Sequence, residues 1–102
     1  MKRAKIIWSP DADNDLIHEG KRIALDKPRA AVSFIARLRK SVNRLRAFPE
    51  SGWMLEDVPV SDYREIVFRG YRIIYHYDGK AVNILKVIHS SRRFRLNDLK
   101  RD

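Results

Sequence analysis

The chain has 102 residues, with 22 Lys and Arg, 13 Asp and Glu, no cysteine and a formal net charge of +9 at pH 7. We expect one domain over residues 1–102, because this length suits a single hydrophobic core. The missing cysteines exclude disulfides and thiolate metal sites, and no apolar run approaches the roughly 18 residues that would span a membrane.

The first half of the chain predicts a strand followed by two helices. The strand covers Lys5–Trp8 and ends at Ser9-Pro10, where serine suits a helix N-cap and proline suits the first helical position. The first helix is expected to run to about Leu25. Asp26 is the expected cap of a second helix that starts at Pro28 and reaches Ala47. The short link between them predicts an antiparallel helical hairpin.

The second helix has the clearest periodicity in the chain, with apolar residues recurring every three or four positions on one side. Its outer side carries Arg37, Lys40 and Arg44 in one line. This line is either a solvated face or a partner-binding surface. A net charge of +9 on so small a domain favours an anionic partner, such as nucleic acid or an acidic protein.

The second half predicts a loop and then three strands, followed by a basic tail. Phe48-Pro49 ends the second helix, and we expect the loop over residues 50–62 to fold Trp53, Met54 and Leu55 onto the core. For the basic segment over residues 90–102, we expect either a short closing helix built on Phe94, Leu96 and Leu99 or a mobile tail. Segments rich in aromatic and β-branched residues predict strands over Tyr63–Phe68, Tyr71–Tyr77 and Ala81–His89. The fold class is therefore α+β, in the order β-α-α-β-β-β, with an antiparallel sheet of about four strands and the hairpin on one face.

Asp78-Gly79 predicts a two-residue hairpin turn that pairs Tyr77 with Lys80. Alternation then gives one face that reads as core, made of Tyr71, Ile73, Tyr75, Val82, Ile84 and Ile88. The other face is amphipathic and contains Arg72, Ile74, His76, Asn83, Leu85, Val87 and His89. We therefore predict that Arg72 and His89 share the face turned away from the helices. We also predict an exposed apolar patch that binds a partner, consisting of Ile74, Leu85 and Val87.

This order of elements resembles the RelE/ParE superfamily of toxins from bacterial type II toxin–antitoxin modules. The resemblance extends over nearly the whole chain and is carried by Trp8–Leu16, Pro28, Ala30-Ala31, Phe34, Leu38, Leu45, Phe48-Pro49, Gly52, Tyr63–Ile66, Tyr71–Tyr75 and Ile84–Arg92. It implies a small toxin that arrests growth when free. It also implies a cognate antitoxin with a segment that wraps the domain, in a toxin–antitoxin hetero-oligomer. Because the basic start of the chain lacks the apolar length of a signal peptide, we expect the protein in the cytoplasm.

One branch of the superfamily, the RelE-like branch, consists of ribosome-dependent mRNA endoribonucleases that need no metal. Such cleavage needs cations for the phosphate and an acid–base pair. By resemblance, the catalytic residues would be Arg64, Arg72, His89, Arg92 and Arg93. However, Ile66 occupies the place of an expected Lys, and no Tyr follows Arg93.

The other branch, the ParE-like branch, blocks DNA gyrase without cutting RNA. The long helical hairpin, the Ile88-His89 ending of the last strand and the missing tyrosine favour this branch. A third interpretation is a basic nucleic-acid-binding module without toxicity. A structural role for the two arginines is the alternative to a functional one: Arg64 and Arg72 pair with acids at Glu56, Asp57 or Glu65. The histidines have no metal-ligand spacing, so no metal and no cofactor are expected.

Overall fold

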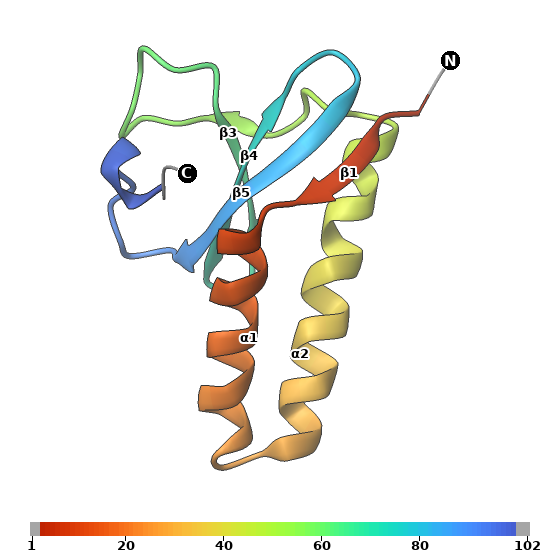
Figure 1. Cartoon of the computed structure of the whole chain (residues 1–102), viewed down its shortest axis with the longest axis vertical. Coiled ribbons are helices and arrows are strands. Elements are labelled where there is room, and N and C mark those ends of the chain that lie inside the picture. Colours follow the sequence, from red (N-terminus) through yellow and green to blue (C-terminus); the bar gives the residue numbers. More distant parts are fainter. Residues whose placement is uncertain (1–2, 100–102) are drawn as a thin grey trace.

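The computed structural model describes residues 3–99, which form a mixed sheet and two helices (Figure 1). The helical hairpin consists of α1 (Pro10–Ala24) and α2 (Pro28–Ser41), and a 3-10 helix, η1 (Val42–Arg46), extends α2. The strands are β1 (Lys5–Trp8), β2 (Trp53–Met54), β3 (Arg64–Phe68), β4 (Tyr71–Tyr77) and β5 (Ala81–His89), and a second 3-10 helix, η2, covers Leu96–Asp98. The α+β class and the helical hairpin are confirmed.

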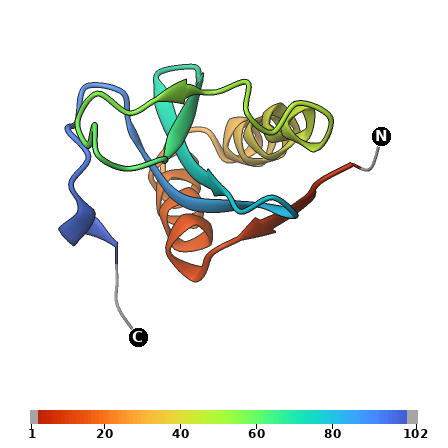
Figure 2. The same ribbon diagram turned by 90° about the horizontal axis from the view of Figure 1, so that it is seen from above.

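The sheet has five strands in the order β1-β5-β4-β3-β2, so it is slightly larger than the predicted four. It is mixed, because β1 runs parallel to β5 while the other three pairs are antiparallel. The extra strand is the two-residue β2, which pairs with Arg64 and Glu65 of β3. The view from above shows the hairpin on one face of the sheet and the C-terminal segment away from it (Figure 2).

The first helix begins as predicted, with the Ser9 side chain accepting a hydrogen bond from the Ala12 N–H. The second begins differently, because Lys27 is its N-cap and no side chain caps it. The Asp26 N–H donates to the Ile23 carbonyl, so Asp26 still belongs to the turn that closes α1. The prediction of Asp26 as the cap was therefore wrong by one residue.

Hydrophobic clusters cover both faces of the sheet centre. The larger cluster lies under the hairpin and includes Leu16, Leu38, Val42, Leu45, Ile73, Tyr75, Val82, Ile84 and Val87. The smaller lies on the opposite face, where the loop between β2 and β3 and the C-terminal segment supply Leu55, Val58 and Phe94 against Ile74 and Ile88. The face that we predicted to be open to partners is thus largely covered by the chain itself. Ile74 and Val87 are both buried, so the prediction of an exposed apolar patch there was wrong.

The hairpin between β4 and β5 turns one residue later than predicted. Tyr77 pairs with Val82, which leaves Gly79 and Lys80 as the central residues of the turn. Gly79 has a positive φ of 94°, as a turn with a left-handed first central position requires. The Asp78 carboxylate accepts the backbone N–H groups of Lys80 and Ala81, which places Asp78 before the turn rather than inside it.

A β-bulge at Leu85 reverses the alternation of β5. The pairs run Tyr75 with Ile84 and then Ile74 with Lys86, so Leu85 has no partner across the ladder. Beyond the bulge His89 pairs with Tyr71, on the face of the helices, while Arg72 pairs with Ile88 on the other face. The prediction that Arg72 and His89 share a face was therefore wrong.

Helix α1 holds this bulge in place. The Ser9 hydroxyl donates to the Leu85 carbonyl at 3.1 Å, and the Asp15 carboxylate accepts the Val87 N–H at 2.9 Å. Asp15 also pairs with the Lys86 ammonium at 3.1 Å. The polar residues near the start of the chain thus satisfy the backbone groups that the irregular strand leaves unpaired.

Candidate functional site

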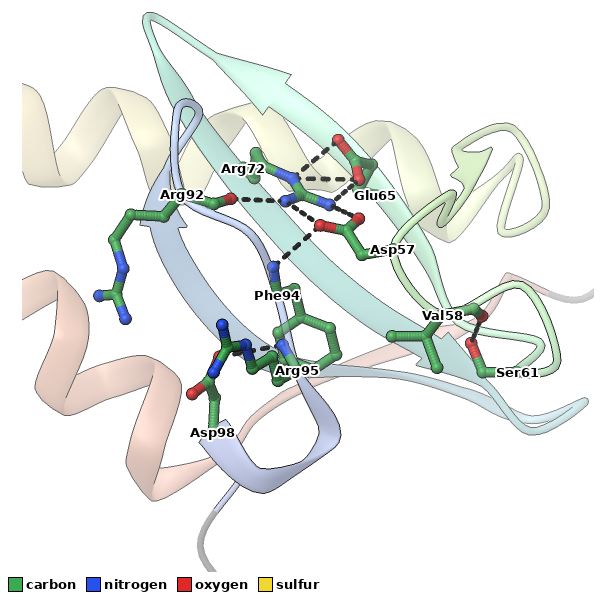
Figure 3. Close-up of polar contacts among 9 residues, drawn as sticks. All are labelled: Asp57, Val58, Ser61, Glu65, Arg72, Arg92, Phe94, Arg95 and Asp98. Atoms are coloured by element: carbon green, nitrogen blue, oxygen red, sulfur yellow. Dashed lines mark hydrogen bonds and ion pairs between the residues drawn. The ribbon is translucent and has the colours of Figure 1, made fainter.

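Arg72 lies at the centre of an ionic network on the sheet face opposite the hairpin (Figure 3). Its side chain is only 9% exposed. Both of its terminal nitrogens donate to the Asp57 carboxylate, and Nε and Nη2 donate to Glu65. Nη1 also donates to the Arg92 carbonyl at 2.8 Å. All five N–H groups of the guanidinium therefore have an acceptor within the chain.

This network ties three separate segments together. Asp57 belongs to the loop before β3, Glu65 to β3 itself, and Arg92 to the C-terminal segment. The Asp57 carboxylate also accepts the Phe94 N–H at 2.9 Å. Hydrogen bonding from Arg72 lowers the pKa of Asp57 to about 2, and the same bonds raise the pKa of Arg72. The pairing of Arg72 with Asp57 and Glu65, which was one of the open interpretations, is confirmed.

The five candidate ribonuclease residues do not form one site. Arg64 pairs with Tyr75 across the strands and donates to the Gly52 carbonyl at 3.0 Å, on the helix side of the sheet. His89 also lies on that side, and its Nδ1 is 2.8 Å from the Ser91 hydroxyl. Arg72 lies on the opposite side, and Arg92 and Arg93 are exposed in the segment after β5. The sheet therefore separates Arg72 from His89, and of the candidate cations in the strands only Arg64 lies on the side of the histidine.

A cleft of about 620 Å³ opens beside the network. Its lining residues are Trp53, Met54, Glu56, Asp57, Glu65, Val67, Arg72, Ser90 and Arg93. Three of them are exposed apolar side chains: Trp53 at 78%, Met54 at 47% and Val67 at 56%. An exposed apolar group around a cleft is typical of a site that binds a partner.

This cleft was not predicted, because we expected Trp53 and Met54 to fold onto the core, and only Leu55 does so. Trp53 stands opposite Glu65 in the short strand β2, which forms the edge of the sheet, and its side chain is 78% exposed. A two-residue strand has too few positions for an alternating pattern, so the sequence carries no signal of this pairing.

The other predicted partner-binding residues lie elsewhere. Leu85 is half-buried at the bulge, and Arg37, Lys40 and Arg44 are exposed along α2 and η1. Among residues 3–99, no three His, Cys, Asp or Glu side chains are grouped so that they could hold a metal ion. Within the same range, no helix has the length and apolar character needed to cross a membrane.

Comparison with known proteins assigns the family. A family model described as "ParE toxin of type II toxin-antitoxin system, parDE" matches residues 6–94. Among solved structures, the chain is similar to one from the "Chromosomal ParDE TA system from P. aeruginosa", with a TM-score of 0.74 and 18% identity over 85% of this chain and 96% of that chain. At this level of identity, that likeness concerns the fold alone. No curated protein matches the sequence. Since the family model extends from Ile6 in β1 to the buried Phe94, the chain belongs to the ParE toxin family of type II toxin–antitoxin systems.

Proposed function

We propose that this toxin, when free of its antitoxin, arrests growth by binding DNA gyrase and does not cleave mRNA. The observation that carries the proposal is the complete pairing of Arg72, the residue that a ribonuclease mechanism would place at the scissile phosphate. A guanidinium whose five N–H groups all have internal acceptors cannot also bind phosphate oxygens unless it breaks at least one of these pairings. Breaking a buried pair of this kind costs about 3–5 kcal/mol.

The acid–base requirement of RNA cleavage argues in the same direction. A general base must reach the ribose 2′-hydroxyl on the same side of the sheet as the cations that stabilise the phosphate. Here His89 and Arg72 lie on opposite faces, and Ile66, where the resemblance to ribonucleases expects a Lys, is a buried core residue. The bases next to Arg72 are the Asp57 and Glu65 carboxylates, and both already accept hydrogen bonds from its guanidinium, while His89 lies on the other face.

The cleft beside Arg72 supports binding to a protein. Tryptophan and methionine are enriched at the centres of protein interfaces, where they supply large apolar area at few positions. Trp53, Met54 and Val67 are exposed around this cleft, although most apolar side chains of the β-strands are buried. We therefore propose the cleft as the surface that contacts gyrase. We further propose a cognate antitoxin that neutralises the toxin in a hetero-oligomeric complex.

The test measures both candidate activities with the purified chain. We expect inhibition of gyrase supercoiling of relaxed plasmid DNA, and intact mRNA in a translating ribosome extract followed by primer extension. Trp53→Ala should weaken gyrase inhibition by at least about tenfold, as for an interface hot spot. The matched control is Val60→Ala, at a loop residue that is 95% exposed and does not line the cleft. Cleaved mRNA with normal supercoiling would refute the proposal.

A further inference from the structure

The positive charge of this protein is concentrated in two short segments. Residues 1–8 and 28–46 contain nine Lys and Arg and no Asp or Glu. In the rest of the chain, the other 13 basic residues are matched by the 13 acidic ones. The whole net charge of +9 therefore comes from the N-terminal segment with β1 and from α2 with η1.

The fold brings these two segments together. The Ala4 N–H donates to the Arg46 carbonyl at 2.8 Å, so Arg3 and Lys5 flank the end of η1. Figure 1 shows β1 passing beside the end of the helix that follows α2. Two parts of the chain that lie far apart in sequence thus form one cationic region, which we call the α2 basic surface.

Along the helix, the basic side chains follow a line. Arg29, Arg37, Lys40 and Arg44 recur at spacings that keep them on one side of a helix. At a rise of 1.5 Å per residue, the line is about 22 Å long. All four side chains are exposed, and among residues 3–99 none of them forms an ion pair. Arg39 is different, because it pairs with Asp13 and covers the Trp8 ring.

The α2 basic surface is charged but has little exposed apolar area, and this combination indicates which kind of partner it can bind. A protein segment binds largely through apolar burial. The exposed large apolar residue of α2 is Val32, which lies about 140° round the helix from Arg37 and therefore outside the line of cations. Single-stranded nucleic acid needs aromatic rings for its bases. Here Phe34 packs on Tyr71 and Arg39 covers the Trp8 ring. Phe48 is 67% exposed but lies beyond the end of η1, so the line from Arg29 to Arg44 carries no row of free rings for successive bases. A double-stranded phosphate backbone needs only the cations.

We infer that the α2 basic surface binds the phosphate backbone of double-stranded DNA without sequence specificity. This activity is separate from the proposed inhibition of gyrase and is measured without that enzyme. With about five phosphates neutralised, the logarithm of the binding constant falls with a slope of about −4.5 against the logarithm of salt concentration. Affinity then drops about 500-fold between 50 and 200 mM salt.

The experiment measures fluorescence anisotropy of a labelled 20-base-pair DNA duplex with the full chain, purified free of partner proteins, over a series of salt concentrations. The test variant replaces Arg37, Lys40 and Arg44 by Gln. The control replaces Lys21, Arg69 and Lys80 by Gln, three exposed cations from the charge-balanced part of the chain. Both variants have the same net charge, so a difference between them reports position rather than total charge.

We expect the test variant to lose about 3 units of salt slope, one for each phosphate contact removed, while the control keeps the wild-type slope within one unit. Circular dichroism checks that both variants remain folded. Several outcomes would overturn the inference. One is no binding by the wild-type chain at 50 mM salt, and another is an equal loss in both variants. Tighter binding to an RNA duplex would also overturn it, and so would tighter binding to a poly-glutamate peptide that depends on the same three residues.

Discussion

Replacing Arg72 by Met tests the ionic network directly, because Met keeps much of the side-chain volume and removes the charge. The variant leaves the Asp57 and Glu65 carboxylates facing each other in a mostly buried site. Removing one partner of such a network costs about 3–5 kcal/mol of unfolding free energy. This is a large share of the 5–15 kcal/mol that is usual for a domain. The measurement is urea unfolding at pH 7, followed by far-ultraviolet circular dichroism.

The pH dependence distinguishes lost charge pairing from lost packing. In the wild type, Arg72 lowers the pKa of Asp57 from 3.8 to about 2. This pairing stabilises the fold above about pH 4, and its contribution is lost as the pH falls towards 2. In the variant the same carboxylate is buried without a cation, so protonation should stabilise the fold as the pH falls. The difference between wild type and variant should therefore shrink between pH 7 and pH 3.

Two controls complete this experiment. Arg93→Met changes an exposed arginine that lines the same cleft and should cost no more than about 0.5 kcal/mol. Adding Asp57→Asn and Glu65→Gln to Arg72→Met removes the unpaired charges and should recover part of the lost stability. A cost below about 1 kcal/mol for Arg72→Met at pH 7, or a cost independent of pH, would refute the reasoning.

Three further changes test other parts of the fold by chemical denaturation. Gly52→Ala places a methyl group 2.6 Å from the Tyr75 hydroxyl and 2.7 Å from a backbone carbonyl, so we expect a loss of about 1–3 kcal/mol, and a neutral result would show that this loop can move. Asp15→Leu leaves the Val87 N–H at the bulge without an acceptor and should cost about 1–3 kcal/mol, whereas Asp15→Asn, which still offers an oxygen, should cost less. Trp53→Ala should change stability by less than about 0.5 kcal/mol, and a larger loss would mean that this residue is part of the core.

Local signals in the sequence determined the helices and the main strands. Ser9-Pro10 and Pro28 start the two helices where the structure has them, because N-capping and the fixed φ of proline depend only on neighbouring residues. The strands over residues 71–77 and 81–89 are also as predicted, since aromatic and β-branched residues suit a pleated surface wherever the sheet is placed. The order of these elements was sufficient to predict the fold class, and that order together with the residues along it carried the resemblance to the toxin superfamily.

Only the tertiary structure decided which residues meet on each face. The bulge at Leu85 depends on Ser9 and Asp15, which are 76 and 72 residues away from the groups they bind. No local pattern reports such contacts, yet the bulge places Arg72 and His89 on opposite faces. The sequence left open whether Arg72 is a working surface cation or pairs with nearby acids, and it is buried because a loop and the C-terminal segment fold back over it. Those segments are irregular, so only their long-range partners determine where they lie.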